Sequence, residues 1–339
     1  MSAPAPAAPA AGPPGLVVLG NLLVDDVVLE DGRTRMGEAG GAVLYASLAA
    51  ARCGASVGCV SLRGSDYPAA ALAVLAAHGV RLEGVHPLPG PGVRTWLLYE
   101  EGVRRVLHRL GRPSHEAASP EPAHVPEAWR RARAFHLAPM PLATQRALVE
   151  AIRDWESPGA PAFVSLDPHV PVTPQSLGAW GQILWRVDAF LPSDDEMRWP
   201  AGPAGAEAAL ASLAVGSLRF VAWKRGEAGG RLYDAAERRW RAWAAPAEPA
   251  FDPTGAGDAF AAGFVSALLE GQTVEAALER AAATAALAVR AWGHEGLLGS
   301  ARPATGEAAV EPPPGRPRAE AAPERVTRPA ARAPRRKVQ

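Results

Sequence analysis

Cysteine is scarce in this sequence of 339 residues, which contains only Cys53 and Cys59. Two cysteines are too few for a disulfide framework and lack zinc-binding partners at the usual spacing, so we expect buried structural thiols. The formal net charge is zero, because 35 Lys and Arg residues balance 35 Asp and Glu residues. A neutral chain gives no reason to expect nucleic acid or a membrane as a partner.

Long hydrophobic runs are missing as well. Even the alanine-rich stretch 276–292 is interrupted by Glu279, Arg280 and Arg290, so we expect a soluble chain and place it in the cytoplasm. The Ala/Pro arm of residues 1–14 has no basic start and no clean apolar core, which argues against a signal peptide. The eight histidines complete no Ser/His/Asp or metal-binding set by spacing.

What is present is a high apolar content, 48%, which is enough for one large α/β core. Three short apolar runs each end in polar residues and lead into helix-like sequence. This pattern is typical of parallel strands in βα units, whose carboxyl ends gather ligands. The runs are Phe163–Leu166 before Asp167-Pro168, 187–191 before Pro192-Ser193-Asp194-Asp195-Glu196, and 218–223 before Lys224-Arg225-Gly226.

The most informative segment is FDPTGAGDAFAAGFVSALLEG, residues 251–271. Gly255, Ala256 and Gly257 carry little or no side chain, so successive backbone N–H groups can approach an anion closely. The periodic apolar stretch over 259–269 predicts a helix whose positive end adds to that field. The segment therefore predicts a phosphate-handling site.

Asp258 follows this glycine-rich turn directly, and two roles are open for it. At the mouth of an anion site, the negative charge of a carboxylate should repel phosphate, so a carboxylate there needs a purpose. One such purpose is to accept a proton from an attacking hydroxyl, which is the role of a general base. Alternatively, Asp258 caps the helix, because acidic side chains are favoured near a helix N-terminus. From these residues alone, neither role is preferred.

The motif DPTGAGDAFAAGF resembles the C-terminal signature of the PfkB (ribokinase-like) family of sugar and nucleoside kinases. The resemblance implies that Asp258 is the catalytic base and that the amides of Gly255, Ala256 and Gly257 form the anion hole. It also implies a ribokinase-like three-layer α/β/α domain, with a central mainly parallel sheet and a small β-sheet lid.

A second block, residues 37–66, resembles the substrate signature of the same family, with Gly40 and Gly41 as its di-glycine. Two glycines before the helix expected over 42–53 permit close approach to a ligand, although a plain loop-to-helix junction explains them too. By resemblance, Asp25 binds substrate hydroxyls, with Asp26 as the alternative. Tyr45 stands about where many relatives place an Asn that touches the sugar, so it is expected to reshape the substrate pocket.

The family's Asn-x-x-Glu motif, which organises magnesium and phosphate, here becomes Ser193-Asp194-Asp195-Glu196. Glu196 is kept, and Ser193 can still donate and accept a hydrogen bond, so we expect the metal role to survive. The resemblance also implies ATP as the nucleotide and leaves potassium open as an activator. The nucleotide is expected beside Lys224, Arg225, Gly226 and Thr254, and Asp252 and Thr254 match positions that help bind a monovalent cation in some relatives.

Residues 94–98 and 104–108 alternate polar and apolar around a turn at 100–102, as a hairpin should. We expect this hairpin and an earlier segment to form the lid. The lid is assigned to residues 22–36 and 94–109. Thr95 is a candidate for substrate contact, as are Arg94, His108 and Arg109, although a solvated sheet face is the favoured interpretation for any single one. A homodimer through the lid is left open.

The sequence thus predicts a kinase domain over residues 15–299, between the arm and a tail of residues 300–339. The tail, rich in Pro, Ala and Arg, has nine basic residues against four glutamates from Ala301 onward and is expected to be disordered. The expected activity is ATP- and Mg²⁺-dependent phosphorylation of a hydroxyl on a small sugar or sugar-like polyol. The alternatives are a nucleoside kinase of the same family and a non-catalytic binding or regulatory protein that retains the fold.

Overall fold

The computed structural model describes residues 12–101, 103–156, 162–197, 200, 202–247 and 250–298. The predicted basic tail of residues 300–339 lies outside these residues, as does the predicted arm up to residue 11. Within the described residues, no helix is both long and apolar enough to cross a membrane.

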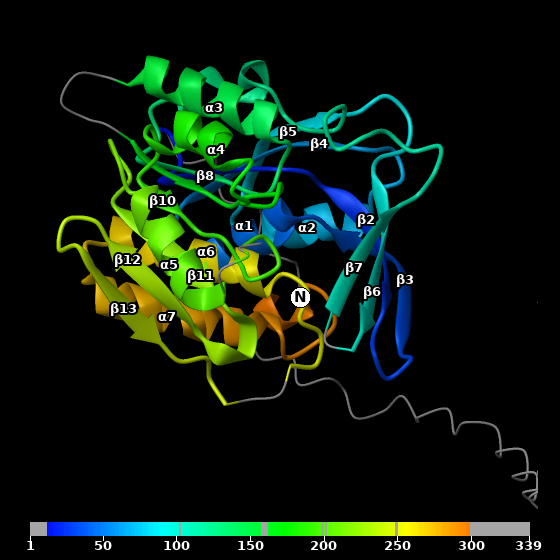
Figure 1. Cartoon of the computed structure of the whole chain (residues 1–339). Helices are drawn as coiled ribbons and strands as arrows, with labels where there is room; N and C mark the ends of the chain where they lie inside the picture. Colours follow the sequence, from blue (N-terminus) through cyan, green and yellow to red (C-terminus); the bar gives the residue numbers. More distant parts are fainter. Residues whose placement is uncertain are drawn as a thin grey trace, which may run out of the picture. The chain divides into compact units, whose positions relative to one another are not determined.

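A nine-stranded main sheet runs through the described residues in the order β13-β12-β11-β10-β9-β8-β1-β4-β5 (Figure 1). Every pairing from β5 to β11 is parallel, and only the β11–β12 and β12–β13 pairings are antiparallel. The strands are β1 (Leu16–Leu19), β4 (Val57–Arg63), β5 (Arg81–Pro87), β8 (Ala134–Leu137), β9 (Phe163–Leu166), β10 (Ala189–Phe190), β11 (Phe220–Lys224), β12 (Gly230–Asp234) and β13 (Arg239–Trp243). The predicted mainly parallel α/β sheet is therefore confirmed.

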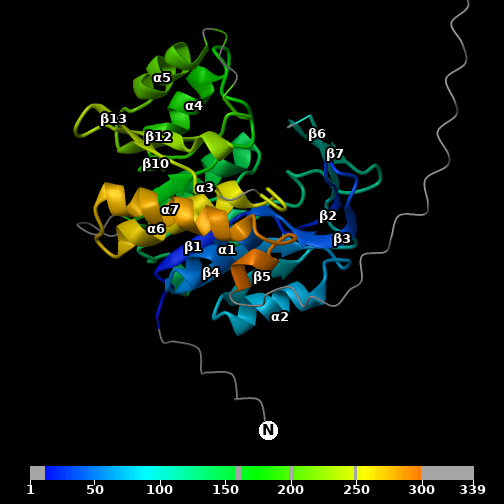
Figure 2. The ribbon, with the colours of Figure 1, turned by 90° about the horizontal axis from the view of Figure 1, so that it is seen from below.

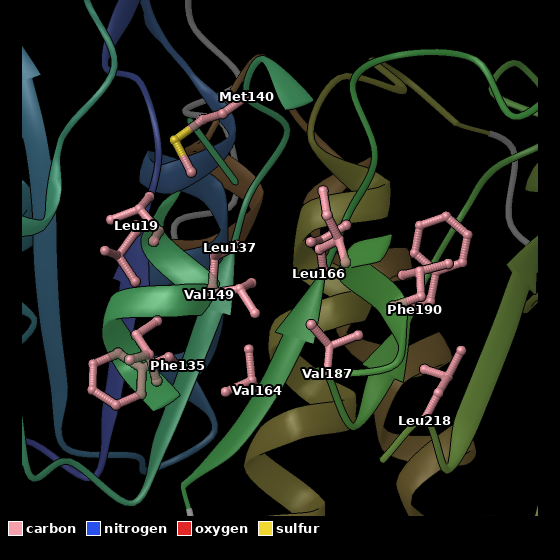
Figure 3. Packing of buried hydrophobic residues seen from close by; sticks show 14 of the residues in the cluster. Leu19, Phe135, Leu137, Met140, Val149, Val164, Leu166, Val187, Phe190 and Leu218 are labelled. Atoms are coloured by element: carbon pink, nitrogen blue, oxygen red, sulfur yellow. The ribbon is translucent and has the colours of Figure 1, made fainter. Parts of the chain in front are cut away.

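Alternate side chains of the strands pack against helices on both faces of this sheet, as the two-residue period of a strand requires. In β1, Val17 and Leu19 join the cluster shown in Figure 3, whereas Leu16 and Val18 join the cluster on the opposite face. The first face is covered by α3 (Leu142–Trp155), α4 (Leu177–Leu184) and α5 (Gly202–Ser212), and the second by α1 (Ala42–Arg52), α2 (Ala69–Ala77), α6 (Ala256–Leu269) and α7 (Val274–Ala288). This is the expected three-layer α/β/α arrangement.

The remaining helical segments are short 3₁₀ turns. They are η1 (Pro122–His124), η2 (Glu127–Trp129), η3 (Gly226–Ala228) and η4 (Glu295–Leu298). Helices α6 and α7 lie side by side in both ribbon views (Figure 2).

A second, four-stranded sheet has the order β3-β2-β6-β7, from β2 (Leu23–Val28), β3 (Thr34–Gly40), β6 (Arg94–Glu100) and β7 (Val103–His108). It leaves the main sheet where β1 ends, and its strands group to one side of the main sheet in both views (Figures 1 and 2). Three of its strands fall within the predicted lid segments, whereas β3 continues to Gly40. We call it the small sheet.

Ion pairs and ring contacts hold the small sheet together and against the main domain. Asp26 accepts two hydrogen bonds from Arg94, at 2.6 and 2.8 Å, and one from the Gly37 amide at 2.8 Å. Burial alone would raise the pKa of Asp26, but these donors outweigh it and lower the pKa. In the turn between β2 and β3, the Arg33 guanidinium lies 4.1 Å from the centre of the Phe251 ring. Phe251 immediately precedes the glycine-rich motif.

Candidate active site

The loops after three neighbouring parallel strands meet at the carboxyl edge of the main sheet. Lys224, the last residue of β11, donates a hydrogen bond of 2.7 Å to Asp167, which follows β9. Ser193, which follows β10, forms a β-bridge with Lys224. The start of α6 lies against the same group, since a Cβ built on Gly257 would be 3.3 Å from the Lys224 ammonium nitrogen.

Asp252 fixes the loop that enters the glycine-rich turn. It is fully buried, and its two carboxylate oxygens accept from the backbone amides of Thr254, at 2.9 Å, and Gly293, at 2.8 Å. Both bonds come from main-chain donors, so Asp252 holds the entry of the turn against the loop that follows α7. A role in binding a cation stays a prediction.

The turn itself depends on glycine at position 255. Gly255 is the N-cap of α6 and has a φ of 79°, in the left-handed region that L side chains rarely adopt. A Cβ at this position would also overlap the ring of Tyr45. Tyr45, predicted to shape the substrate pocket, is only 3% exposed and packs against the turn from inside; contact with a substrate stays a prediction.

Helix α6 begins at Ala256, earlier than the expected 259–269, so Gly257 and Asp258 belong to its first turn. No side chain makes a capping hydrogen bond at Gly255, so the hydrogen bonds give no support to a capping role for Asp258. Burial raises the pKa of Asp258 to about 6, with Lys224 and Arg104 opposing the rise and Glu196 adding to it. A carboxyl group with that pKa is ionised at neutral pH and still basic enough to take a proton.

Lys224 and Asp167 form a buried pair beneath this turn. Burial alone would lower the pKa of Lys224, but Asp167, Glu196 and Asp258 outweigh it, so the ammonium stays charged. Burial raises the pKa of Asp167 to about 7 against the opposing effect of Lys224. The cation therefore stands among three carboxyl groups, a surplus of negative charge that can draw a metal ion or a further cation into the site.

The Ser193–Glu196 segment folds as a closed turn. The amide and the hydroxyl of Ser193 both donate to one oxygen of Glu196, at 2.7 and 2.6 Å. Serine in place of the family's asparagine thus orients the glutamate directly. Next to it, Arg225 lies 4.8 Å from the Trp223 ring and 3.6 Å from Asp194, and Gly226 opens η3 with a φ of 53°.

The predicted substrate-binding residues converge where β1 passes into the small sheet. Asp25 is 4% exposed and accepts a hydrogen bond from the Thr95 hydroxyl of β6. A Cβ on Gly40 would overlap the Asp25 carboxylate, and one on Gly41 would overlap the Asn21 carbonyl, so both positions require glycine. Burial raises the pKa of Asp25 to about 7, partly offset by Thr95 and Arg104.

Two residues of the site, Tyr99 and Arg104, escaped sequence reasoning, and Asp167 was predicted only as the polar end of a strand, without a role of its own. Asp167 carried a usable signal, because it is the first residue after a buried parallel strand. Tyr99 on β6 shares a hydrogen bond of 2.8 Å with the Thr254 hydroxyl, and the Arg104 guanidinium of β7 lies 4.0 Å from Asp195. These contacts join the small sheet to loops of the main sheet, and no local sequence pattern predicts them.

The fold and site together define a ribokinase-like α/β protein with a glycine-rich turn at the start of α6. Residues 17–296 match the family described as pfkB family carbohydrate kinase, and the chain belongs to this family of kinases.

A cytidine kinase of Thermococcus kodakarensis is 29% identical over 280 residues, which cover 82% of this chain and 97% of the relative. Among solved structures, a candidate ribokinase II from E. coli in complex with ATP and Mg²⁺ aligns with a TM-score of 0.66 at 22% identity, covering 82% of this chain and 93% of that one. A fructokinase double mutant from Vibrio cholerae O395, with fructose, ADP and potassium bound, aligns with a TM-score of 0.65 at 17% identity over 85% of this chain and 96% of the other. These two structures support the fold.

Proposed function

We propose that the protein transfers the γ-phosphoryl group of ATP to a hydroxyl of a small sugar or sugar-like polyol, with Asp258 as the general base. The observation that carries this proposal is the position of Asp258 in the first turn of α6, with a pKa of about 6, directly after the Gly255–Gly257 turn. A proton acceptor and an anion-binding backbone are thereby within one helical turn.

In this proposal, Asp258 takes the proton of the acceptor hydroxyl while the oxygen attacks the γ-phosphorus in line. The backbone amides of the Gly255–Gly257 turn and the Lys224 ammonium offset the charge on the phosphoryl oxygens. Asp25, Gly40 and Gly41 orient the acceptor, and Thr95 holds the Asp25 carboxylate. Arg225 and Gly226, at the end of β11, border the nucleotide.

Glu196 suits a magnesium site, because Mg²⁺ prefers hard oxygen donors and the two hydrogen bonds that the carboxylate accepts from Ser193 go to a single oxygen. When bound, the metal would neutralise charge on the nucleotide phosphates. Asp252 and Thr254 stand beside the turn where a potassium ion would act on the anion hole, which makes monovalent-cation dependence part of the proposal.

A nucleoside is the second candidate acceptor, supported by the similarity to the cytidine kinase. A specific feature also favours it: His108 is directly opposite Thr95 in the small sheet, and its ring packs on His115, which stacks on His169 with centroids 4.9 Å apart. Flat rings next to the Asp25–Thr95 pair suit the face of a nucleobase.

The test is ADP release from ATP and Mg²⁺ against a panel of sugars, inositols and nucleosides, with and without potassium. One strong acceptor is expected, and Asp258→Asn should lower kcat for it by about 10³-fold. Asp154→Asn, which removes an exposed carboxylate on α3, is the matched control and should retain activity. If wild type and Asp258→Asn both bind ATP and neither transfers phosphate, the protein is a binding protein and the proposal is wrong.

A further inference from the structure

Tyr45 is a large side chain that is buried between the two ends of the candidate site. It lies in the first turn of α1, four residues after Gly41, which is the N-cap of that helix. It belongs to the apolar cluster in which α1 packs against α6. With only 3% of the residue exposed, little of the ring is available to a substrate.

Two segments of the main domain contact the Tyr45 side chain. A Cβ built on Gly255 would overlap the Tyr45 ring, and a Cβ built on Gly293 would lie 3.5 Å from the Tyr45 hydroxyl oxygen. Asp252 joins the same two segments, because its carboxylate accepts from the amides of Thr254 and Gly293. The glycine-rich turn is therefore held both by hydrogen bonds to Asp252 and by contact with the Tyr45 ring.

The charges around Tyr45 agree with a place between the two ends of the site. Burial raises the pKa of its hydroxyl well above the usual value, and the carboxyl groups of Asp25, Asp252 and Asp258 add to the rise. The hydroxyl therefore stays protonated at neutral pH and does not serve as a proton acceptor. What the residue contributes is the shape of its ring, which fills a fixed volume between α1 and the turn.

We propose that Tyr45 is a positioning residue for phosphoryl transfer, whose ring fixes the Gly255–Gly257 turn relative to the Gly40-Gly41 pair. This inference rests on the proposed function. Gly41 caps the helix that carries Tyr45, and Tyr45 packs on Gly255, which caps α6. Through this side chain, the start of the helix beside the acceptor keeps a fixed distance from the start of the helix beside the phosphoryl group. Small displacements of such groups are costly to the rate.

The experiment compares Tyr45→Leu with Tyr45→Phe and Leu48→Ala on the best acceptor of the panel. Leu48 is three positions further along α1, is 1% exposed and belongs to the same cluster, so its variant disturbs the same packing. We expect Tyr45→Leu to lower kcat by about 10- to 100-fold, with both KM values changed by less than about threefold. Tyr45→Phe keeps the ring and should retain kcat within about twofold. Leu48→Ala should lose thermal stability and retain kcat.

A double variant tests whether Tyr45 acts through the turn. Tyr45→Leu and Gly255→Ala both displace the same backbone, so combining them should lower kcat by clearly less than the product of the two single effects. Independent effects would multiply, and that result would overturn the inference. Thermal unfolding shows which variants are folded at the assay temperature, and Tyr45→Met takes the place of Tyr45→Leu if the latter does not fold.

The remaining outcomes separate this inference from the proposed function. Wild-type kcat in Tyr45→Leu, alongside an inert Asp258→Asn, would overturn the inference and leave the proposed function intact. A raised KM for the acceptor with an unchanged kcat would also overturn it, because Tyr45 would then be a substrate contact. A wild type that phosphorylates no acceptor would instead overturn the proposed function, and the inference with it.

Discussion

The two ends of the site are built differently. The phosphate end, comprising Asp167, Glu196, Lys224 and Gly255–Asp258, comes from loops of the main sheet and the start of α6. The acceptor end, comprising Asp25, Gly40, Gly41 and Thr95, forms where the small sheet departs from β1. Under the proposed function, the chemistry is thus tied to the main sheet, whereas acceptor recognition depends on how the two sheets meet. Variants can separate these contributions.

Among the variants that compare the two ends, the largest effect is expected from Lys224→Met at the phosphate end. Removing the ammonium should lower kcat by about 10²- to 10³-fold and, at pH 8, destabilise the fold by about 3 kcal/mol, because Asp167 loses its buried partner. Adding Asp167→Asn should restore stability and leave activity low. Kinetics and thermal unfolding measure the two effects, and retained kcat in the single variant would contradict the assignment.

Gly255→Ala probes the shape of the turn, with Gly271→Ala as its control. The two glycines have φ values of 79° and 76°, but only position 255 has a ring where the Cβ would go. Gly271→Ala should cost about 1 kcal/mol of folding free energy from backbone strain, and Gly255→Ala about 2 kcal/mol more from the overlap with Tyr45. Equal losses in denaturant unfolding would show that the Tyr45 contact is unimportant.

Asp25→Asn tests the acceptor end. It should raise the KM for the acceptor by about 10- to 100-fold through loss of a charged hydrogen-bond partner, with a smaller change in the KM for ATP. Asp26→Asn should chiefly reduce thermal stability, because Asp26 accepts hydrogen bonds from Arg94 and from the Gly37 amide inside the small sheet. If Asp26→Asn gave the larger rise in KM for the acceptor, the roles of the two residues would be reversed.

The pH profile should distinguish the two ends again. Both carboxyl groups have raised pKa values, about 6 for Asp258 and about 7 for Asp25, so each loses its charge as the pH falls through that value. We expect kcat/KM to fall about tenfold per pH unit below 7 and more steeply below 6. In Asp25→Asn, a single ionisation near pH 6 should remain. An unchanged profile in that variant would assign the upper ionisation to another group.

The smallest effect is expected from Tyr99→Phe. Loss of its hydroxyl removes one hydrogen bond to Thr254, worth about 1 kcal/mol, so kcat should fall by about fivefold. The KM for the acceptor should change less than in Asp25→Asn. A loss of stability without any change in kcat would make the contact purely structural.

The phosphate end was largely predictable because its determinants are local in sequence. Gly255, Ala256, Gly257 and Asp258 are consecutive, and the apolar runs of β9 and β11 marked the strand ends that carry Asp167 and Lys224. The helix start was placed three residues late, because Ala256 and Gly257 resemble turn residues and the apolar period begins only at Ala259.

Contacts between the sheets could not be predicted in the same way. Tyr99 and Thr254 are 155 residues apart, and each fits an ordinary strand or loop on its own. Arg104 appeared as one of several polar residues of a hairpin, and its direction depends on the register with β6. The structure was also needed to separate the contacts of Asp25, which binds Thr95, from those of Asp26, which binds Arg94, since neighbouring strand residues point to opposite faces.

The two bonds of Asp252 bear on the order in which the chain folds. The bond from Gly293 joins residues 41 positions apart and closes a loop that contains both α6 and α7, whereas the bond from Thr254 spans only two positions. A shorter loop costs less entropy to close than a longer one, and contacts between residues that are near in sequence form faster. Asp25 and Thr95 are 70 residues apart, and Tyr99 must find Thr254 over a longer separation still. The glycine-rich turn is therefore expected to form before the surface that we propose binds the acceptor.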